Sequence, residues 1–258
     1  MRKFLHTFAL GTIIAAVSAP LAAQESLPDG RAVINRYIEA IGGRDAILNQ
    51  GGHHVRGRFE APAQGLTGDL EAYAKPPNLF WLRISIQGIG DILQGFDGTT
   101  GWTVNPMMGP MILDSLQLRQ LKQQANLYSD LYPDSTIASL ETVKDTTFTV
   151  MVDSTHTDVP CYKVKVTTTW GEEYSQFFAK DSGLQVGTIR TVASPMGDVE
   201  STTTLSDWRE VDGVKTPFRT VQNTMGMVNR LIVTTAERVP VPDSIFALPP
   251  EIQALVKK

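Results

Sequence analysis

The chain has 258 residues, of which 42% are apolar and 19% are charged, and its formal net charge is −4. Without the two N-terminal cations, Arg2 and Lys3, the net charge becomes −6. That sign argues against nucleic acid or an anionic membrane surface as the main partner. The single cysteine, Cys161, excludes an internal disulfide.

Residues 1–23 have the layout of a secretory signal peptide. A cationic start, Met1-Arg2-Lys3, precedes an apolar run over 8–17 and small residues that end at Ala23. This pattern predicts export and cleavage near Ala23, and the alternative is an uncleaved N-terminal anchor. Since no cysteine stands at the cleavage site, no lipid anchor is expected. The mature chain, 24–258, is predicted to be soluble and to form one domain, because nothing in it marks a linker.

Residues 29–49 predict a helix, a break and a short second helix. Asp29 can cap the first helix, and Gly42-Gly43 ends it. The helix has an apolar stripe at i, i+3, i+4 and i+7, formed by Ile34, Tyr37, Ile38 and Ile41.

From 53 to 106 the hydrophobic period changes to two, as in antiparallel strands with one buried face. Residues 106–111 are predicted to form an apolar loop, and a helix begins at Asp114-Ser115 and ends around 131–133. Its stripe is Leu118, Leu121, Ala125 and Tyr128. Further strands fill 140–238, and a short docked helix closes the chain. We expect ten or eleven strands in one sheet.

No catalytic or metal-binding constellation is recognisable. His53 and His54 are adjacent in a strand and point to opposite faces, and His156 lies in a polar turn. Cys161 is interpreted as a buried structural thiol, with a reactive nucleophile as the alternative. Gly88-Ile89-Gly90 is a turn between strands rather than a dinucleotide fingerprint. The sequence therefore predicts a protein that is not an enzyme and indicates no cofactor or metal.

Methionines cluster in the segments between strands: Met107, Met108, Met111, Met196, Met225 and Met227. Flexible, polarisable side chains of this kind suit irregular apolar ligands such as acyl chains. The alternative interpretation is that these loops close the ends of a solid core.

Three motifs resemble the LolA/LolB-like family of periplasmic lipoprotein-sorting and lipid-carrier proteins. They are Gly95-Phe96-Asp97-Gly98 through Trp102 and Pro106, Phe177-Phe178-Ala179-Lys180-Asp181-Ser182-Gly183-Leu184, and Trp208 through Gly213 to Pro217. The resemblance covers about residues 30–252. It implies mainly β structure with some helix: an open, strongly curved antiparallel sheet, or incomplete β-barrel, covered by helices on its concave face. The arginine that latches the lid of the classical chaperone has no match, nor does the lipidated cysteine of the outer-membrane receptor.

The resemblance implies a periplasmic carrier for a lipid or the acyl chain of a lipoprotein, with an inner- or outer-membrane protein as a possible partner. We expect the protein to be a monomer and to have no nucleic-acid partner. The alternative is a non-catalytic periplasmic interaction or sensor module. We predict that a hydrophobic cavity and its lid are formed by Phe59, Leu70, Phe80, Leu82, Ile84, Ile86, Trp102, Met107, Met108, Met111, Leu118 and Leu121. The strand over 78–87 and Trp102 would be the floor, and the methionines and the central helix the cover.

Overall fold

The computed structural model describes residues 26–152, 155–194 and 197–257. The predicted signal peptide, residues 1–23, and Met196 lie outside the described residues. The helices are α1 (Gly30–Ala40), α2 (Gly43–Leu48), α3 (Ser115–Ala125) and α4 (Pro250–Val256), with 3-10 turns η1 (Pro62–Gln64), η2 (Pro133–Ser135) and η3 (Asp243–Phe246). The strands are β1 (His53–Ala61), β2 (Leu66–Lys75), β3 (Leu79–Ile86), β4 (Gly90–Phe96), β5 (Gly101–Asn105), β6 (Gly109–Ile112), β7 (Ile137–Val152), β8 (Thr155–Thr168), β9 (Glu173–Ala179), β10 (Gln185–Ser194), β11 (Gly197–Val211), β12 (Val214–Thr224) and β13 (Met227–Arg238).

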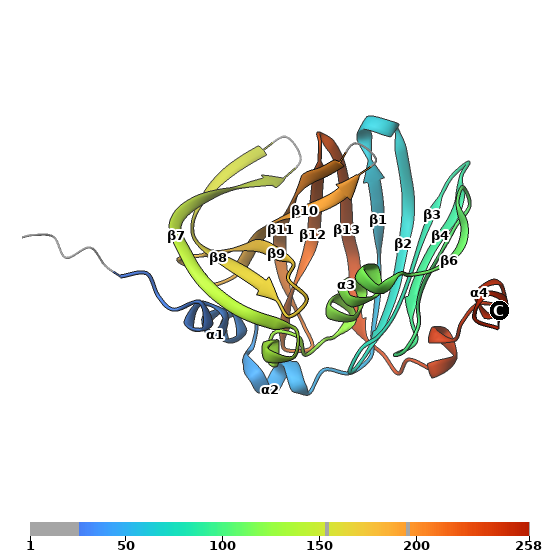
Figure 1. The fold of residues 1–258 in the computed structure, drawn as a ribbon, viewed down its shortest axis with the longest axis horizontal. Helices are drawn as coiled ribbons and strands as arrows, with labels where there is room; N and C mark the ends of the chain where they lie inside the picture. The colour runs from blue at the N-terminus through green and yellow to red at the C-terminus, as the bar shows by residue number, and fades with distance from the viewer. Residues whose placement is uncertain (1–25, 153–154, 195–196, 258) are drawn as a thin grey trace, which may run out of the picture.

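All thirteen strands of the described residues form one antiparallel sheet in the order β6-β5-β4-β3-β2-β1-β13-β12-β11-β10-β9-β8-β7. Two meanders, β1 to β6 and β7 to β13, therefore join where β1 pairs with β13. The edges β6 and β7 do not pair, so the sheet is strongly curved but open (Figure 1). This confirms the expected fold. The expected ten or eleven strands were too few, and Gly109–Ile112, predicted as part of a loop, is one of the additional strands.

Helix α1 packs as its sequence pattern predicts. The Asp29 carboxylate caps it by accepting a hydrogen bond from the Arg31 amide. Its stripe enters the largest core cluster, which includes Ile34, Tyr37, Ile38 and Phe178. Gly42 has a φ of +129° and lies directly against the Gly213 backbone, so a side chain has no room there. Glycine thus allows α2 to pack beside the β11–β12 turn.

Helix α3 connects the two edges of the sheet and lies inside its curve (Figure 1). Asp114 and Gln117 form a capping box at its N-terminus. The helix ends at Ala125, earlier than the expected 131–133, because Asn126 is extended and its side chain accepts from the Tyr128 amide. The predicted stripe is confirmed for Leu118, Leu121 and Ala125, but Tyr128 lies beyond the helix.

The far end of the chain also packs on the sheet. Helix α4 contacts β6, on the side of the sheet away from α3 (Figure 1), and its Ile252 is fully buried.

Cys161 is buried too, and desolvation raises the pKa of its thiol to about 11, which supports the structural interpretation of this residue. His156 is exposed, as expected. Within the described residues, none of the helices combines the length and the apolar character needed to cross a bilayer.

Candidate functional site: a cavity between the sheet and the central helix

The inner face of the sheet, defined here as the face that carries Phe59 and Ile84 and looks onto α3, borders a cavity of about 700 Å³. This volume lies within the usual range for ligand pockets. Strands β1, β3 and β7–β13 supply its walls, and α3 and the segment that follows it close one side. The strong curvature of a single sheet, rather than an interface between domains, creates this space.

The cavity lining changes in character along the sheet. Near β1, β3 and β13 it is apolar, with Phe59, Ile84 and Leu231. At β7 and β8 it is apolar again, with Leu140 and Val166. Between them lie uncharged polar side chains: Asn229, Gln222, Thr220, Thr203, Thr188, Gln185 and Gln176. The cavity is therefore amphipathic and not the wholly hydrophobic hollow expected from the sequence.

Helix α3 has two faces with different roles. Leu121 and Ala125 are buried against Phe96 of β4, and Leu118 and Phe80 pack on the same cluster. Gly101 of β5 makes this docking possible, since a Cβ there would lie 2.9 Å from Leu118.

The opposite face of α3 carries Gln120, Gln123 and Gln124, which line the cavity. The side-chain amide of Gln120 donates to Glu172 over 3.2 Å, and that of Gln123 donates to the Tyr174 hydroxyl over 3.2 Å. The helix is therefore fixed to β4 and β5 by apolar packing and to the start of β9 by hydrogen bonds.

Three ionisable groups also face the cavity: Asp130, Arg190 and Tyr174. Burial raises the pKa of the Asp130 carboxyl to about 6, so this acid is partly protonated near neutrality. Arg190 stacks 4.9 Å from the centre of the Tyr174 ring and lies 3.9 Å from the Glu172 carboxylate. Burial also raises the pKa of Tyr174, which keeps its hydroxyl protonated. The charge of the arginine is thus already compensated within the cavity wall.

The structure brings together only part of the predicted site. Phe59 and Ile84 line the cavity. Leu70, Ile86 and Leu121 are buried, and Phe80 and Leu118 pack on the cluster beneath α3. Leu82 is half-buried and pairs with Ala72 and Gln94. Between β3 and the α3 stripe, Phe80 packs in one cluster with Leu118 and Leu121, and the cavity lies farther along the sheet.

Trp102 was assigned to the wrong face. Trp102 lies directly opposite Gly95 in the neighbouring strand. Gly95 pairs with Trp81, and Trp81 pairs with Tyr73. Directly opposed residues share a face, so Trp102 lies on the outer face, whereas Phe80 pairs with Phe96 on the inner face. The Trp102 ring covers Gly95 and is fully buried.

The predicted methionine cover is also corrected. Met107 and Met108 occupy the turn between β5 and β6 and are 84% and 66% exposed, while Met111 is in β6 and 36% exposed. None of the three borders the cavity. Because the segment forms a hairpin, it extends the sheet instead of folding over it.

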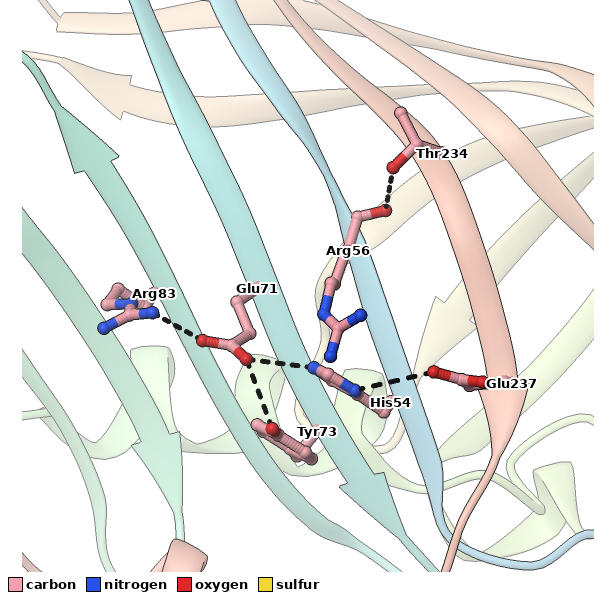
Figure 2. A network of polar contacts seen from close by, with 7 residues as sticks. All are labelled: His54, Arg56, Glu71, Tyr73, Arg83, Thr234 and Glu237. Atoms are coloured by element: carbon pink, nitrogen blue, oxygen red, sulfur yellow. Dashed lines mark hydrogen bonds and ion pairs between the residues drawn. The ribbon is translucent and has the colours of Figure 1, made fainter.

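A separate polar network lies on the outer face of β1 to β3, on the side of the sheet opposite to α3 (Figure 2). Glu71 is its centre. Its carboxylate accepts hydrogen bonds from His54 Nε2 at 3.0 Å, from the Tyr73 hydroxyl at 3.2 Å and from Arg83 at 2.6 Å. The His54 and Tyr73 rings stack at 4.2 Å.

Desolvation would raise the pKa of Glu71, but the hydrogen bonds from His54 and Tyr73 and the charge of Arg83 outweigh it and lower this pKa. The network residues do not border the cavity. We therefore interpret the network as a brace across three strands. Elsewhere, the described residues contain no group of three or more His, Cys, Asp or Glu side chains that could hold a metal ion.

The residues that sequence reasoning missed are the polar ones: the α3 glutamines, Asp130, Arg190 and the row across β9–β13. One signal was available for the glutamines, since positions 120, 123 and 124 share a helix face opposite to the apolar stripe. The polar row across β9–β13 could not be recognised from the sequence, because it becomes visible only when the register of the five strands is known.

No family model and no curated protein matches this sequence. Solved structures share the fold. A LolA superfamily protein of Nitrosomonas europaea is 14% identical, with a TM-score of 0.54 over 86% of this chain and 99% of that one. A DUF1329 family protein of Desulfovibrio piger is 11% identical, with a TM-score of 0.56 over 86% and 98% of the two chains. A domain assigned to outer membrane lipoprotein sorting from Vibrio parahaemolyticus is 10% identical, with a TM-score of 0.53 over 89% and 98%. The chain therefore has a LolA-like fold over most of its length.

Proposed function

We propose that this protein is a non-catalytic carrier that binds a lipid, or the acyl chain of a lipoprotein, in the cavity between the inner face and α3. The observation that carries the proposal is the cavity itself, with a volume of about 700 Å³. It lies between a continuous sheet and a helix that hydrogen bonds attach to β9. The LolA-like fold of the structural neighbours supports the same class of function.

The apolar flank of the cavity would hold the alkyl part of such a ligand. Phe59 of β1 pairs with Leu231 of β13, and Ile84 lies two strands from Phe59, on β3. Each methylene transferred from water to such a surface contributes about 0.8 kcal/mol, so a long chain binds firmly without polar recognition. Release requires an acceptor with an equally apolar surface.

The carrier would work in the periplasm. The pattern of residues 1–23 supports export and cleavage, and the fold shared with a lipoprotein-sorting domain supports the same compartment. The mature chain, 24–258, would act as a monomeric single domain. It would receive or deliver its ligand at an inner- or outer-membrane protein.

The test is lipid that co-purifies with the protein. The exported chain is purified without detergent, extracted with organic solvent and examined by mass spectrometry, together with two variants. Leu231→Trp places a large ring in the cavity, whereas Ile232→Trp places it on the opposite face of the same strand. We expect lipid with the wild type and with Ile232→Trp, and a severalfold loss with Leu231→Trp. Absence of lipid from the wild type, or equal amounts in both variants, would contradict the proposal.

A further inference from the structure

Five uncharged polar side chains form one continuous row across the floor of the cavity. Asn229 pairs with Gln222, Gln222 with Thr203, Thr203 with Thr188, and Thr188 with Gln176. Because directly opposed residues share a face, the row crosses β13, β12, β11, β10 and β9 without a break. All five residues line the cavity, and we call this row the polar ladder.

The polar ladder has unused hydrogen-bonding capacity. Thr188 accepts a bond from the Gln185 amide at 2.8 Å, and Gln222 donates to Ser201 at 3.2 Å. The side chains of Gln176, Thr203 and Asn229 have no hydrogen-bond partner anywhere in the described ranges of the chain. A ligand made only of methylenes would leave these groups desolvated and unpaired, which costs about 1–3 kcal/mol for each group.

The charges around the polar ladder oppose a charged ligand group. An anion would meet Asp130, which lines the cavity, and Arg190 is already engaged with Glu172 and the Tyr174 ring. A cation would be repelled by Arg190, and Asp130, the one carboxylate among the described lining residues, is a group whose ionised form burial already disfavours. A neutral group with several hydroxyl or amide groups avoids both costs and can pair with the ladder.

We propose that the ligand of this cavity is an amphiphile with an uncharged head group rich in hydroxyl or amide groups, such as a sugar. The head group lies on the polar ladder, and the alkyl chain lies against Phe59, Ile84 and Leu231. The inference rests on the proposed carrier function and narrows its substrate class. In this arrangement Thr188 and Thr203 contact the head group and determine which head groups the cavity accepts.

The test compares three amphiphiles with the same twelve-carbon chain, each used below its micelle concentration: dodecyl maltoside, dodecanoate and dodecyltrimethylammonium. Dissociation constants are measured by displacement of a fluorescent fatty acid from delipidated mature protein. We expect the maltoside to bind at least about tenfold more tightly than either charged amphiphile, the equivalent of one to two hydrogen bonds.

Matched variants assign the preference to the polar ladder. Thr203→Val keeps the shape of the side chain and removes the hydroxyl, and its control Thr202→Val makes the same change at the next residue, on the opposite face. Thr203→Val should weaken maltoside binding about fivefold or more and leave dodecanoate unchanged. Thr202→Val should bind like the wild type, and Thr188→Ser should keep the selectivity that Thr188→Val loses. Melting temperatures of all four variants verify the fold.

The outcomes separate this inference from the carrier proposal. Equal affinity for all three amphiphiles, or a preference that survives Thr203→Val and Thr188→Val, would overturn the head-group inference and leave the carrier function standing. If the wild type binds neither the fluorescent fatty acid nor any of the three amphiphiles, both proposals fail.

Discussion

The side-chain amide of Gln123 in α3 donates a hydrogen bond to the hydroxyl of Tyr174 in β9 over 3.2 Å. This bond joins the helix that closes the cavity to one of the strands in its wall. The apolar stripe of α3 is buried on β4 and β5, so Gln123 and Gln120 hold the other side of the helix. Opening the cavity along β9 therefore means breaking two hydrogen bonds rather than a hydrophobic core.

Tyr174→Phe should loosen α3 without unfolding the protein. The change removes one hydrogen bond and costs about 0.5–1.5 kcal/mol. Amides of residues 115–125 should exchange hydrogen faster, while the β1–β2 amides keep their rates. Tyr162→Phe is the control, because this half-buried tyrosine packs near α1. Equal effects of both variants on α3 would show that Gln123 does not hold the helix.

Asp130→Asn should stabilise the protein at neutral pH. The Asp130 pKa rises from an ordinary 3.8 to about 6, so the carboxyl costs nothing below pH 3.8 and destabilises the fold as pH rises through 6. The variant should gain up to about 3 kcal/mol at pH 7 and nothing at pH 3.5. Urea unfolding at both pH values measures the difference, and a gain that is the same at both would contradict the assigned cause.

Ile38→Asp should destabilise the fold severely. Ile38 is 8% exposed in the core cluster that joins α1 to β8 and β9, and an unpaired charge there costs several kcal/mol. We expect a loss of about 3–5 kcal/mol or failure to fold. Glu39→Asp, on the exposed side of the same helix, is the control and should change the melting temperature by little. A mild effect of Ile38→Asp would show that α1 is dispensable.

Glu71→Gln should weaken the outer-face brace in a pH-dependent way. The lowered pKa of Glu71 means that its stabilising contribution is present above about pH 4.5 and is lost as pH falls through the folded-state pKa. The variant should lose about 1–3 kcal/mol at pH 7, and the difference should shrink in acid. Glu237→Gln, whose carboxylate is 3.9 Å from His54 and 55% exposed, is the matched control with little effect. A Glu71→Gln deficit that does not shrink at all as the pH is lowered from 7 would exclude the ionised brace.

The sequence was sufficient to predict the packing of an element when that packing depends on the residues of the element alone. The stripe of α1 and the cap at Asp29 follow from helical periodicity alone, and the structure has both. Trp102 could not be placed, because its face depends on whether Gly95 or Phe96 lies opposite it, and strand register is a property of two segments. Met107 and Met108 were misplaced for a related reason: an apolar turn between two short strands cannot be distinguished in sequence from a loop that folds over a core.

The cavity was the hardest part to predict. Its apolar wall includes Phe59 and Ile84, which alternation did identify. Its polar wall is a row across five strands, and each strand contributes a threonine, glutamine or asparagine that alone predicts only a solvated position. Only the pairing of these strands places the five side chains side by side.

Photo-crosslinking tests most directly whether a lipid occupies the space between the inner face and α3. Delipidated protein is irradiated with a long-chain fatty acid that carries a diazirine on its acyl chain, and the modified residues are mapped by mass spectrometry. Adducts should fall on inner-face residues that line the cavity, such as Phe59, Ile84 and Leu231, and an excess of unlabelled fatty acid should suppress them. Adducts confined to the exposed methionines Met107 and Met108, or to outer-face residues such as Tyr73 and Trp81, would contradict the account.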